Sequence, residues 1–258
     1  MEKVTRDLGI QTRGTIFFKT VQILAYANDI DLIALTIHGL NEAFLNLEKS
    51  ARNMGLVINQ EKTVYMHSEK DTTFQLDRAI GNYVFKRVDN FKYLVTMVNK
   101  MNNRSVEVNA RLIMANRAYH VLQNHMKSRN ISRNIKTLLS KTLIRPVLTY
   151  GAETLVLSKQ DDHHLCISER KILWRICGPL IDGGRWRIRT NQELYELCGE
   201  NDIVKFCKLS RLRRAGHVTC QDDDDLSRRV LLSEPGGKCP RGRPRLHWED
   251  GVKEDAGQ

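Results

Sequence analysis

The chain has 258 residues, of which 41% are hydrophobic and 28% are charged, so it can bury a core as one large domain or as two ordinary ones. No apolar run reaches the roughly 20 residues of a membrane span and no signal-like segment opens the chain, so we expect a nuclear or cytoplasmic protein with no membrane partner. The net charge is +11, and residues 101–258 carry 9 of these charges. This imbalance predicts a polyanionic partner, RNA or DNA, for the second half.

The first clear element is a β-hairpin predicted over residues 21–35. Two apolar runs, VQILAYA and IDLIAL, meet at Asn28 and Asp29, whose short side chains suit a tight turn. The hairpin therefore presents a carboxylate at its tip, with Asp31 close behind. A carboxylate so placed, beside another from a neighbouring strand, is how polymerase-type sites hold Mg²⁺.

A helix follows the hairpin, and short strands follow the helix. Apolar residues recur at helical spacing from Leu40 to Met54, and Gly55 suits the helix end. Residues 72–98 then alternate in short apolar and polar runs, TTFQL, YVFKRV and FKYLVTMV, which predict a small antiparallel set of strands.

After Met101 the periodicity becomes helical and predicts an α-hairpin. The expected face of its first helix is Ala110, Ile113, Met114, Arg117, Ala118, Val121 and Leu122. The expected face of the second helix is Ile135, Leu138, Leu139, Thr142 and Leu143. Pro146 is expected to kink or end this second helix, because proline lacks an N–H donor.

A third helix is predicted from about Gln160 to Cys177, and an Arg-rich loop follows it. Arg185, Arg187 and Arg189 alternate along this stretch, so an extended backbone would direct three guanidinium groups to one side, as a phosphate-binding site requires. The alternative is an ordinary basic loop. Helices near 191–198 and 201–217 come next, and the second carries Arg211, Arg213 and Arg214.

The tail contains Arg241, Arg243 and Arg245 in a PRGRPR stretch that resembles an AT-hook, a segment that inserts arginine into a narrow A·T minor groove. The six cysteines lie in the second half without a C-x2-C pattern, and we expect reduced thiols, half-buried on helices. Cys207, His217 and Cys220 come nearest to a zinc-ligand spacing, but no fourth ligand is evident.

Several of these stretches together resemble the reverse transcriptases of retrotransposons without terminal repeats (LINE-type). Tyr26-Ala27-Asn28-Asp29 is similar to the YxDD-type box, and residues 54–63 are similar to the next palm motif. Residues 91–95, FKYLV, resemble the primer-grip motif, usually FKYLG. YGAE at 150–153, RLRRAGHV at 211–218 and the RGRP tail are similar to the region after the polymerase. The resemblance runs from about residue 10 to about residue 250, in the family's order.

The resemblance implies an α+β fold: a partial palm (an antiparallel hairpin plus a helix) at 1–100, a helical thumb-like region at 101–180, and a basic nucleic-acid-binding region at 181–258. It implies that Tyr26, Asn28 and Asp29 form the catalytic box, that Asp29 is the residual Mg²⁺ ligand, and that Lys62 lies near the triphosphate. A solvated turn lysine is the alternative for Lys62. Phe91, Lys92 and Tyr93 would contact nucleic acid.

Two departures from the family predict a loss of polymerase activity. Asn28 replaces the first aspartate of the box, and a neutral amide does not supply the charge that Mg²⁺ binding needs. The earlier palm motif and the fingers have no counterpart. In addition, Val95 replaces a glycine at a turn that needs positive φ. We therefore expect a degenerate RNA-directed DNA polymerase that retains nucleic-acid binding. The alternatives are a non-enzymatic basic nucleic-acid-binding module and a genomic remnant without a selected role.

Overall fold

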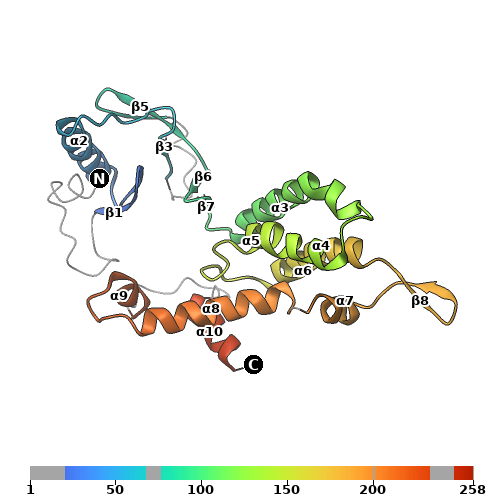
Figure 1. The fold of residues 1–258 in the computed structure, drawn as a ribbon. Helices are drawn as coiled ribbons and strands as arrows, with labels where there is room; N and C mark the ends of the chain where they lie inside the picture. Colours follow the sequence, from blue (N-terminus) through green and yellow to red (C-terminus); the bar gives the residue numbers. More distant parts are fainter. Residues whose placement is uncertain (1–20, 68–76, 200, 233–246, 258) are drawn as a thin grey trace. The chain divides into compact units, whose positions relative to one another are not determined.

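The computed structural model describes residues 21–67, 77–199, 201–232 and 247–257. They divide into two compact units (Figure 1). Unit 1 comprises the described residues of Met1–Asn103 and Gln221–Pro240, and unit 2 those of Arg104–Cys220 and Arg241–Gln258. Helices and small, mainly antiparallel sheets occur together, so the predicted α+β class is confirmed. The three functional regions with boundaries at 100 and 180 stay a prediction. No described helix is long and apolar enough to cross a membrane.

Unit 1 contains one long helix and seven short strands among its described residues. The elements are β1 (Val21–Tyr26), β2 (Asp29–Ala34), α2 (Ile37–Asn53), β3 (Val64–Tyr65), β4 (Arg78–Ile80), β5 (Tyr83–Arg87), β6 (Asn90–Tyr93), β7 (Thr96–Asn99) and the short α9 (Leu226–Leu232).

Helix α2 organises the core of unit 1, as its periodicity predicts. Thr36 caps its start by accepting a hydrogen bond from the Gly39 N–H over 3.1 Å, and Gly55 follows its end with φ of +73°. Leu47 packs on the apolar side chains of β1 and β2, while Phe44 meets Phe85 edge-to-face at 4.9 Å. The helix thus joins the β1–β2 hairpin to the sheet formed by β3, β5 and β4.

The strands after α2 are only partly antiparallel. β4–β5 and β6–β7 are antiparallel hairpins, which confirms that part of the prediction. β3 pairs with β5 in parallel, which the short apolar runs did not predict. The TTFQL run at 72–76 lies outside the described residues.

Unit 2 is mainly helical. Its elements are α3 (Arg104–Lys127), α4 (Arg133–Leu139), the π-helical turn η2 (Ser140–Ile144), α5 (Arg145–Thr149), α6 (Lys159–Cys177), β8 (Leu180–Asp182), β9 (Arg185–Arg187), α7 (Asn191–Cys198), α8 (Ile203–Thr219) and α10 (Trp248–Ala256).

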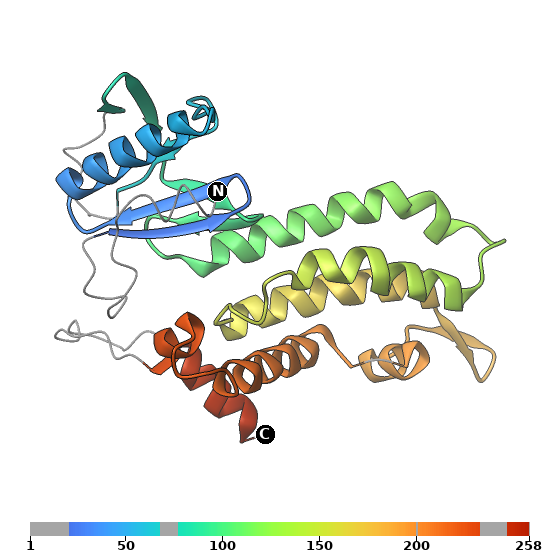
Figure 2. The ribbon, with the colours of Figure 1, turned by 60° about the vertical axis from the view of Figure 1, so that its left-hand side comes forward.

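Helix α6 lies at the centre of this unit, in contact with α3, α4, α7 and α8. Figures 1 and 2 show α3, the α4–α5 segment and α6 side by side, with the β8–β9 hairpin projecting beyond them. Leu165, Ile172, Leu173 and Ile176 are buried, as the predicted face of the third helix requires. Ser158 and Asp161 form a capping box at the start of α6.

The predicted faces of the first two helices of unit 2 are only partly correct, with Ala118, Leu122 and Leu139 packed against the core. Ile113 and Val121 of α3 are 54% and 78% exposed, and Ile135, Leu138 and Leu143 are also exposed. The buried face of α3 instead includes Glu107 and Arg111, one turn apart. These two side chains form an ion pair with each other, so their charges can be buried together at positions that a hydrophobic pattern assigns to solvent.

The second helix does not end at Pro146. It continues from α4 through η2 into α5, with Pro146 in the first turn of α5. A π-helical turn replaces the regular i→i−4 bonds immediately before the proline, so the missing N–H donor is accommodated without breaking the helix.

Candidate functional site

The tip of the β1–β2 hairpin carries the acid-containing box. Tyr26 pairs with Asp29 across the two strands, so the turn consists of Ala27 and Asn28, with Ala27 at φ of +50°. The sequence placed both Asn28 and Asp29 in the turn, and this is corrected: Asp29 is the first residue of β2. All four side chains are exposed.

Asp31 adds a second carboxylate on the same face of β2. Side chains two residues apart on a strand point to the same side, so Asp29 and Asp31 share one face. Burial raises the pKa of the Asp31 carboxyl above its usual value. Burial also raises the pKa of Tyr93, and the negative charges of Asp31 and Asp29 raise it further. The structure therefore brings Tyr93 of the predicted primer-grip motif near the acids of the β1–β2 hairpin.

The β6–β7 hairpin holds Tyr93 in this position. Phe91 pairs with Val98 and Tyr93 with Thr96, leaving Leu94 and Val95 as the turn. Both turn residues have positive φ, +44° and +69°. The sequence indicated that Val95 would disfavour this turn, yet the turn forms, at the steric cost that a β-branched residue bears in the left-handed region. Lys92 is exposed on the hairpin.

The turn at the hairpin tip lacks one of the two carboxylates that the related box supplies to Mg²⁺. Asn28 offers a neutral amide oxygen in the turn, where the related box has a carboxylate. Asp29 and Asp31 are the acids on this face of β2. Among the described residues, no three His, Cys, Asp or Glu side chains gather as metal ligands. We therefore derive no catalytic step through Mg²⁺.

Lys62 lies in a turn that Asn59 organises. The Asn59 side chain accepts a hydrogen bond from the Lys62 N–H over 3.2 Å, and its carbonyl accepts one from the Thr63 hydroxyl over 2.8 Å. The Lys62 side chain is exposed. The role of Lys62 near the triphosphate stays a prediction.

The arginines around β9 differ in what they contact. Arg187 bonds Glu193 at 2.7 Å and Asp182 at 2.8 Å, and Arg189 donates to the Gly178 carbonyl at 3.1 Å. The hydrogen bond from Arg187 lowers the pKa of Glu193 to about 2. Arg185 is exposed at the tip of the β8–β9 hairpin. Of the three predicted phosphate contacts, two thus hold the hairpin to its own unit, and Arg185 faces solvent.

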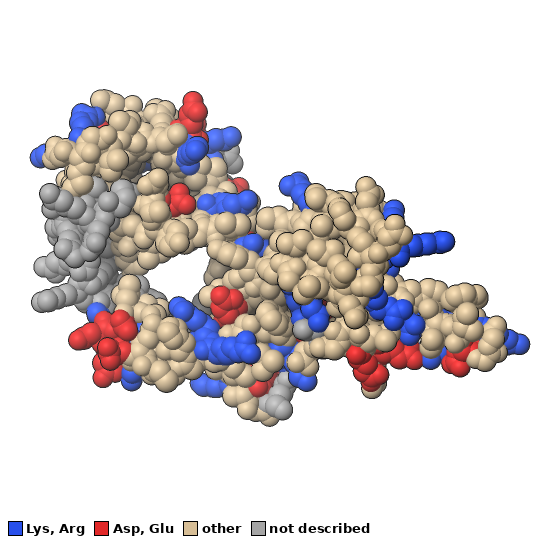
Figure 3. All heavy atoms as spheres, viewed as in Figure 1, with Lys and Arg blue, Asp and Glu red and all other residues tan. Residues whose placement is uncertain are grey.

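The arginines of α8 divide in the same way. Arg211 is buried and donates to Asp255 of α10 at 2.8 Å, a role that the sequence did not indicate. Arg213 and Arg214 are exposed, as is Lys205. Figure 3 shows Lys and Arg side chains gathered over α8. Arg241, Arg243 and Arg245 lie outside the described residues.

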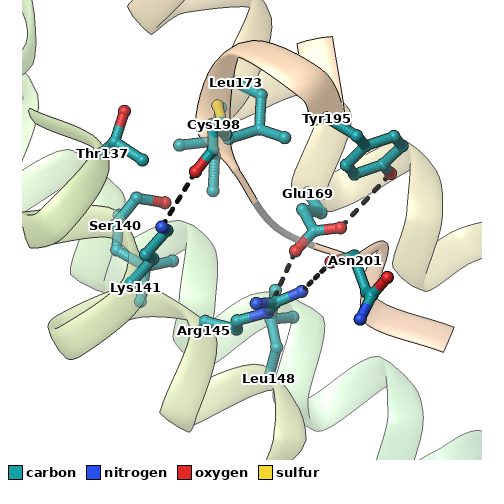
Figure 4. A pocket seen from close by; sticks show the side chains of 12 residues that line it. Thr137, Ser140, Lys141, Arg145, Leu148, Glu169, Leu173, Tyr195, Cys198 and Asn201 are labelled. Carbon is teal, nitrogen blue, oxygen red and sulfur yellow. Dashed lines mark hydrogen bonds and ion pairs between the residues drawn. The ribbon is translucent and has the colours of Figure 1, made fainter. Parts of the chain in front are cut away.

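A buried ionic cluster around Glu169 was not anticipated (Figure 4). Glu169 accepts hydrogen bonds from the Ile203 N–H at 2.9 Å and the Tyr195 hydroxyl at 3.3 Å, and it lies 3.2 Å from the Arg145 guanidinium. Burial raises the pKa of Glu169, and Arg145, the Ile203 N–H and Tyr195 oppose this rise. The cluster ties α5 and α6 to α7 and to the start of α8. No local sequence signal could have shown it, because its members are up to 58 residues apart.

The spacing of Cys207, His217 and Cys220 does not produce a zinc site. Cys207 is buried, whereas His217 and Cys220 are exposed. Cys166 is a half-buried free thiol on a helix, as predicted, whereas the free thiols of Cys177, Cys198 and Cys207 lie on helices but are fully buried. Cys220 is a free thiol too, but it is exposed rather than half-buried.

Comparison with known proteins shows a similarity that covers most of the chain. Over 245 residues the chain is 26% identical to an uncharacterized Caenorhabditis elegans protein described as transposon-derived, a match that covers 90% of this chain and 84% of that protein. No protein-family model matches the chain, and no solved structure does. The similarity extends over nearly all of both chains, which indicates that the chain has a transposon origin.

Proposed function

We propose that the chain is a catalytically inactive remnant of a LINE-type retrotransposon reverse transcriptase that retains nucleic-acid binding through its helical unit. The observation that carries this proposal is Asn28, which occupies the turn of the acid-bearing β1–β2 hairpin. The hairpin, α2 and the β6–β7 hairpin would be the remaining part of the palm. The transposon-derived relative supports the origin, and the exposed cations of α8 support the binding.

The substitution at residue 28 explains why the turn survives and the chemistry does not. An Asn side chain serves a tight turn as well as Asp does, so folding of the hairpin does not require the acid. Polymerisation does require it, because the carboxylates of the box neutralise the metal ions that bind the primer 3′-hydroxyl and the incoming nucleotide. The remaining Asp29 provides one of these two charges.

A primer-extension assay on an RNA template with Mg²⁺ tests the loss of catalysis. We expect no extension from the full chain, and none from the Asn28→Asp variant. The Asp29→Asn variant is the matched control, since it changes the residue next to the turn by one charge in the other direction. Extension by the full chain that Asp29→Asn abolishes would contradict the proposal.

Nucleic-acid binding is assigned to the exposed cations of α8. Arg213 and Arg214 are exposed, whereas Arg211 and Lys208 are engaged with Asp255. The two exposed guanidinium groups, with Lys205 and with Arg185 at the β8–β9 tip, can neutralise phosphates without breaking internal ion pairs. Such contacts do not read the base sequence, so we expect binding without sequence preference.

Fluorescence anisotropy of labelled single-stranded RNA, single-stranded DNA and duplex DNA against the full chain tests this assignment across a salt series. We expect the logarithm of affinity to fall linearly with the logarithm of salt concentration. The Arg213→Ala/Arg214→Ala double variant should bind about tenfold more weakly and reduce the slope by about 2. The matched control, Lys49→Ala/Lys86→Ala, removes two exposed charges from unit 1 and should bind like the unmodified chain. Absence of binding at low salt would contradict the proposed nucleic-acid binding.

A further inference from the structure

Two buried cysteines of unit 2 meet at the ends of consecutive helices. Cys177 is the last residue of α6 and Cys198 is the last residue of α7. Their sulfur atoms are 4.0 Å apart, and the residues are 5% and 8% exposed. This is a contact between two thiols 21 residues apart in the sequence, and nucleic-acid binding makes no use of it.

The surroundings of the pair favour a single thiolate, on Cys177, beside a protonated Cys198. The hydrogen bond with Cys198 lowers the pKa of Cys177 to about 7, and the positive charges of Arg133 and Arg189 act in the same direction against desolvation. The same hydrogen bond and desolvation raise the pKa of Cys198. Cys177 is therefore the nucleophile of the pair, and Cys198 is the protonated partner beside it.

A small open cavity of about 20 Å³, with room for about one water molecule, reaches the pair at Cys198. Cys198 lines this cavity with Thr137, Ser140, Lys141 and Leu173, and Figure 4 shows its side chain at the cavity wall. The Lys141 ammonium donates a hydrogen bond to the Cys198 carbonyl over 3.0 Å, which fixes the end of α7 against the η2 turn. The thiols are thus buried from large molecules, and the small open cavity reaches the pair at Cys198.

We propose that Cys177 and Cys198 are a redox modification site, at which a peroxide forms a reversible disulfide that joins the C-terminal ends of α6 and α7. The sulfur atoms need to approach by about 2 Å to reach bonding distance, a change that side-chain rotation and small helix movements can supply. The proposal does not depend on nucleic-acid binding.

The chemistry balances with hydrogen peroxide as the oxidant. The Cys177 thiolate attacks one peroxide oxygen, the O–O bond breaks, and the departing hydroxide takes a proton to become water, leaving a sulfenic acid on Cys177. The Cys198 thiol then attacks the Cys177 sulfur, a second water leaves with the Cys198 proton, and the disulfide forms. Two thiols and one peroxide thus give one disulfide and two waters, and a dithiol reductant reverses the change.

The disulfide would enclose the segment between the two helices, which contains the β8–β9 hairpin and Arg185. Closing this loop restricts the unfolded chain, and it fixes the end of α7 to α6 in the folded chain. We expect a rise in melting temperature of roughly 5 °C in the oxidised protein.

Peptide mapping of the full chain tests the proposal. The protein is treated with a small excess of hydrogen peroxide, its remaining thiols are alkylated under denaturing conditions, and it is digested with trypsin. We expect peptides 176–185 and 190–205 to be joined by a disulfide, at a mass lower by two hydrogen atoms than the sum of the two peptides, and to separate after reduction. The measurement uses the unmodified sequence, so it does not depend on the folding of a variant.

Variants provide the control. Cys207→Ala changes another buried cysteine of the same unit and should keep both the joined peptides and the rise in melting temperature. Cys198→Ala should lose both, and peroxide should then carry Cys177 to the sulfinic acid. The proposal is overturned if Cys177 and Cys198 are both alkylated after peroxide while exposed Cys220 is oxidised, or if Cys177 pairs with any other cysteine.

Discussion

Arg211 donates a hydrogen bond from Nη1 to Oδ2 of Asp255 over 2.8 Å, and both side chains are buried. The bond joins α8 to α10 across 44 residues of sequence, and the Lys208 ammonium lies 3.7 Å from the other carboxylate oxygen. Burial raises the pKa of nearby Asp162, while Lys208 and Arg211 oppose this rise. The most basic helix of the chain therefore uses part of its charge to hold the C-terminal helix.

Removal of the Asp255 carboxylate should destabilise the protein, because the positive charge of Arg211 is buried. In Asp255→Ala, the buried Arg211 guanidinium loses this ion pair, and we expect the free energy of unfolding to fall by on the order of 3 kcal/mol. Urea denaturation measures this loss. Arg213→Ala, two residues away on the exposed side of α8, is the control and should change the free energy by less than about 0.5 kcal/mol. Equal effects of the two variants would mean that the pair contributes no more than a surface charge.

Two helical glycines should respond oppositely to alanine. A Cβ on Gly251 would lie 2.9 Å from Arg211 Nη1, whose position Asp255 fixes, so we expect Gly251→Ala to destabilise the protein by about 1 kcal/mol or more. Gly216 in α8 has nothing within 4 Å of the same position. There, Gly216→Ala should gain helix propensity and stabilise the protein by up to about 1 kcal/mol. Thermal denaturation of the two variants distinguishes the steric clash expected at residue 251 from the gain in helix propensity expected at residue 216.

The turn of the β6–β7 hairpin should gain stability from glycine. Val95 has φ of +69°, where a β-branched side chain is strained and glycine is not. We expect Val95→Gly to stabilise the protein by about 1 kcal/mol in urea denaturation. This figure is the relief of strain less the cost of the entropy that glycine adds to the unfolded chain. Val98→Gly, in the paired strand β7 where φ is not positive, should destabilise it by a similar amount. Destabilisation by both variants would show that Val95 packing outweighs the strain.

Asp31 should make stability depend on pH. Its pKa is raised by burial, so the folded chain binds this proton more tightly than the unfolded chain does. The stability that this group contributes is present at low pH and is lost as pH rises above 3.8, through the raised value. Asp31→Asn removes the dependence, so the variant should be more stable than the unmodified chain at pH 7, by no more than about 1 kcal/mol because water screens this partly exposed site. The gain should vanish near pH 3, and urea midpoints at the two pH values measure it.

The exposed acid at the hairpin tip provides the comparison for Asp31. Asp29→Asn changes the same kind of side chain on the same face of β2, two residues nearer the turn. We expect the midpoint of this variant to follow that of the unmodified chain at both pH values. A gain at pH 7 as large as that of Asp31→Asn would assign the effect to charge near the turn rather than to burial.

The sequence by itself determined the elements whose causes are local. Apolar spacing with Thr36 and Gly55 set the limits of α2, and the apolar runs around Ala27 and Asn28 set the β1–β2 hairpin. The order of short motifs indicated an origin in a retrotransposon, and the transposon-derived relative supports that origin at the coarser level.

Only the tertiary structure decided which charged side chains are exposed to solvent and which are paired inside the fold. Arg187 and Arg211 share the spacing and chemistry of their exposed neighbours, yet they pair with Glu193 and Asp255 and so stabilise the fold. Glu107 and Arg111 of α3 likewise pair with each other and are buried, although the predicted face of α3 contained neither. A buried charge is tolerated where a partner of opposite sign meets it, and beyond one helical turn that meeting depends on segments far apart in the sequence. Local periodicity records where apolar side chains recur, but it does not record which charges the folded chain will neutralise.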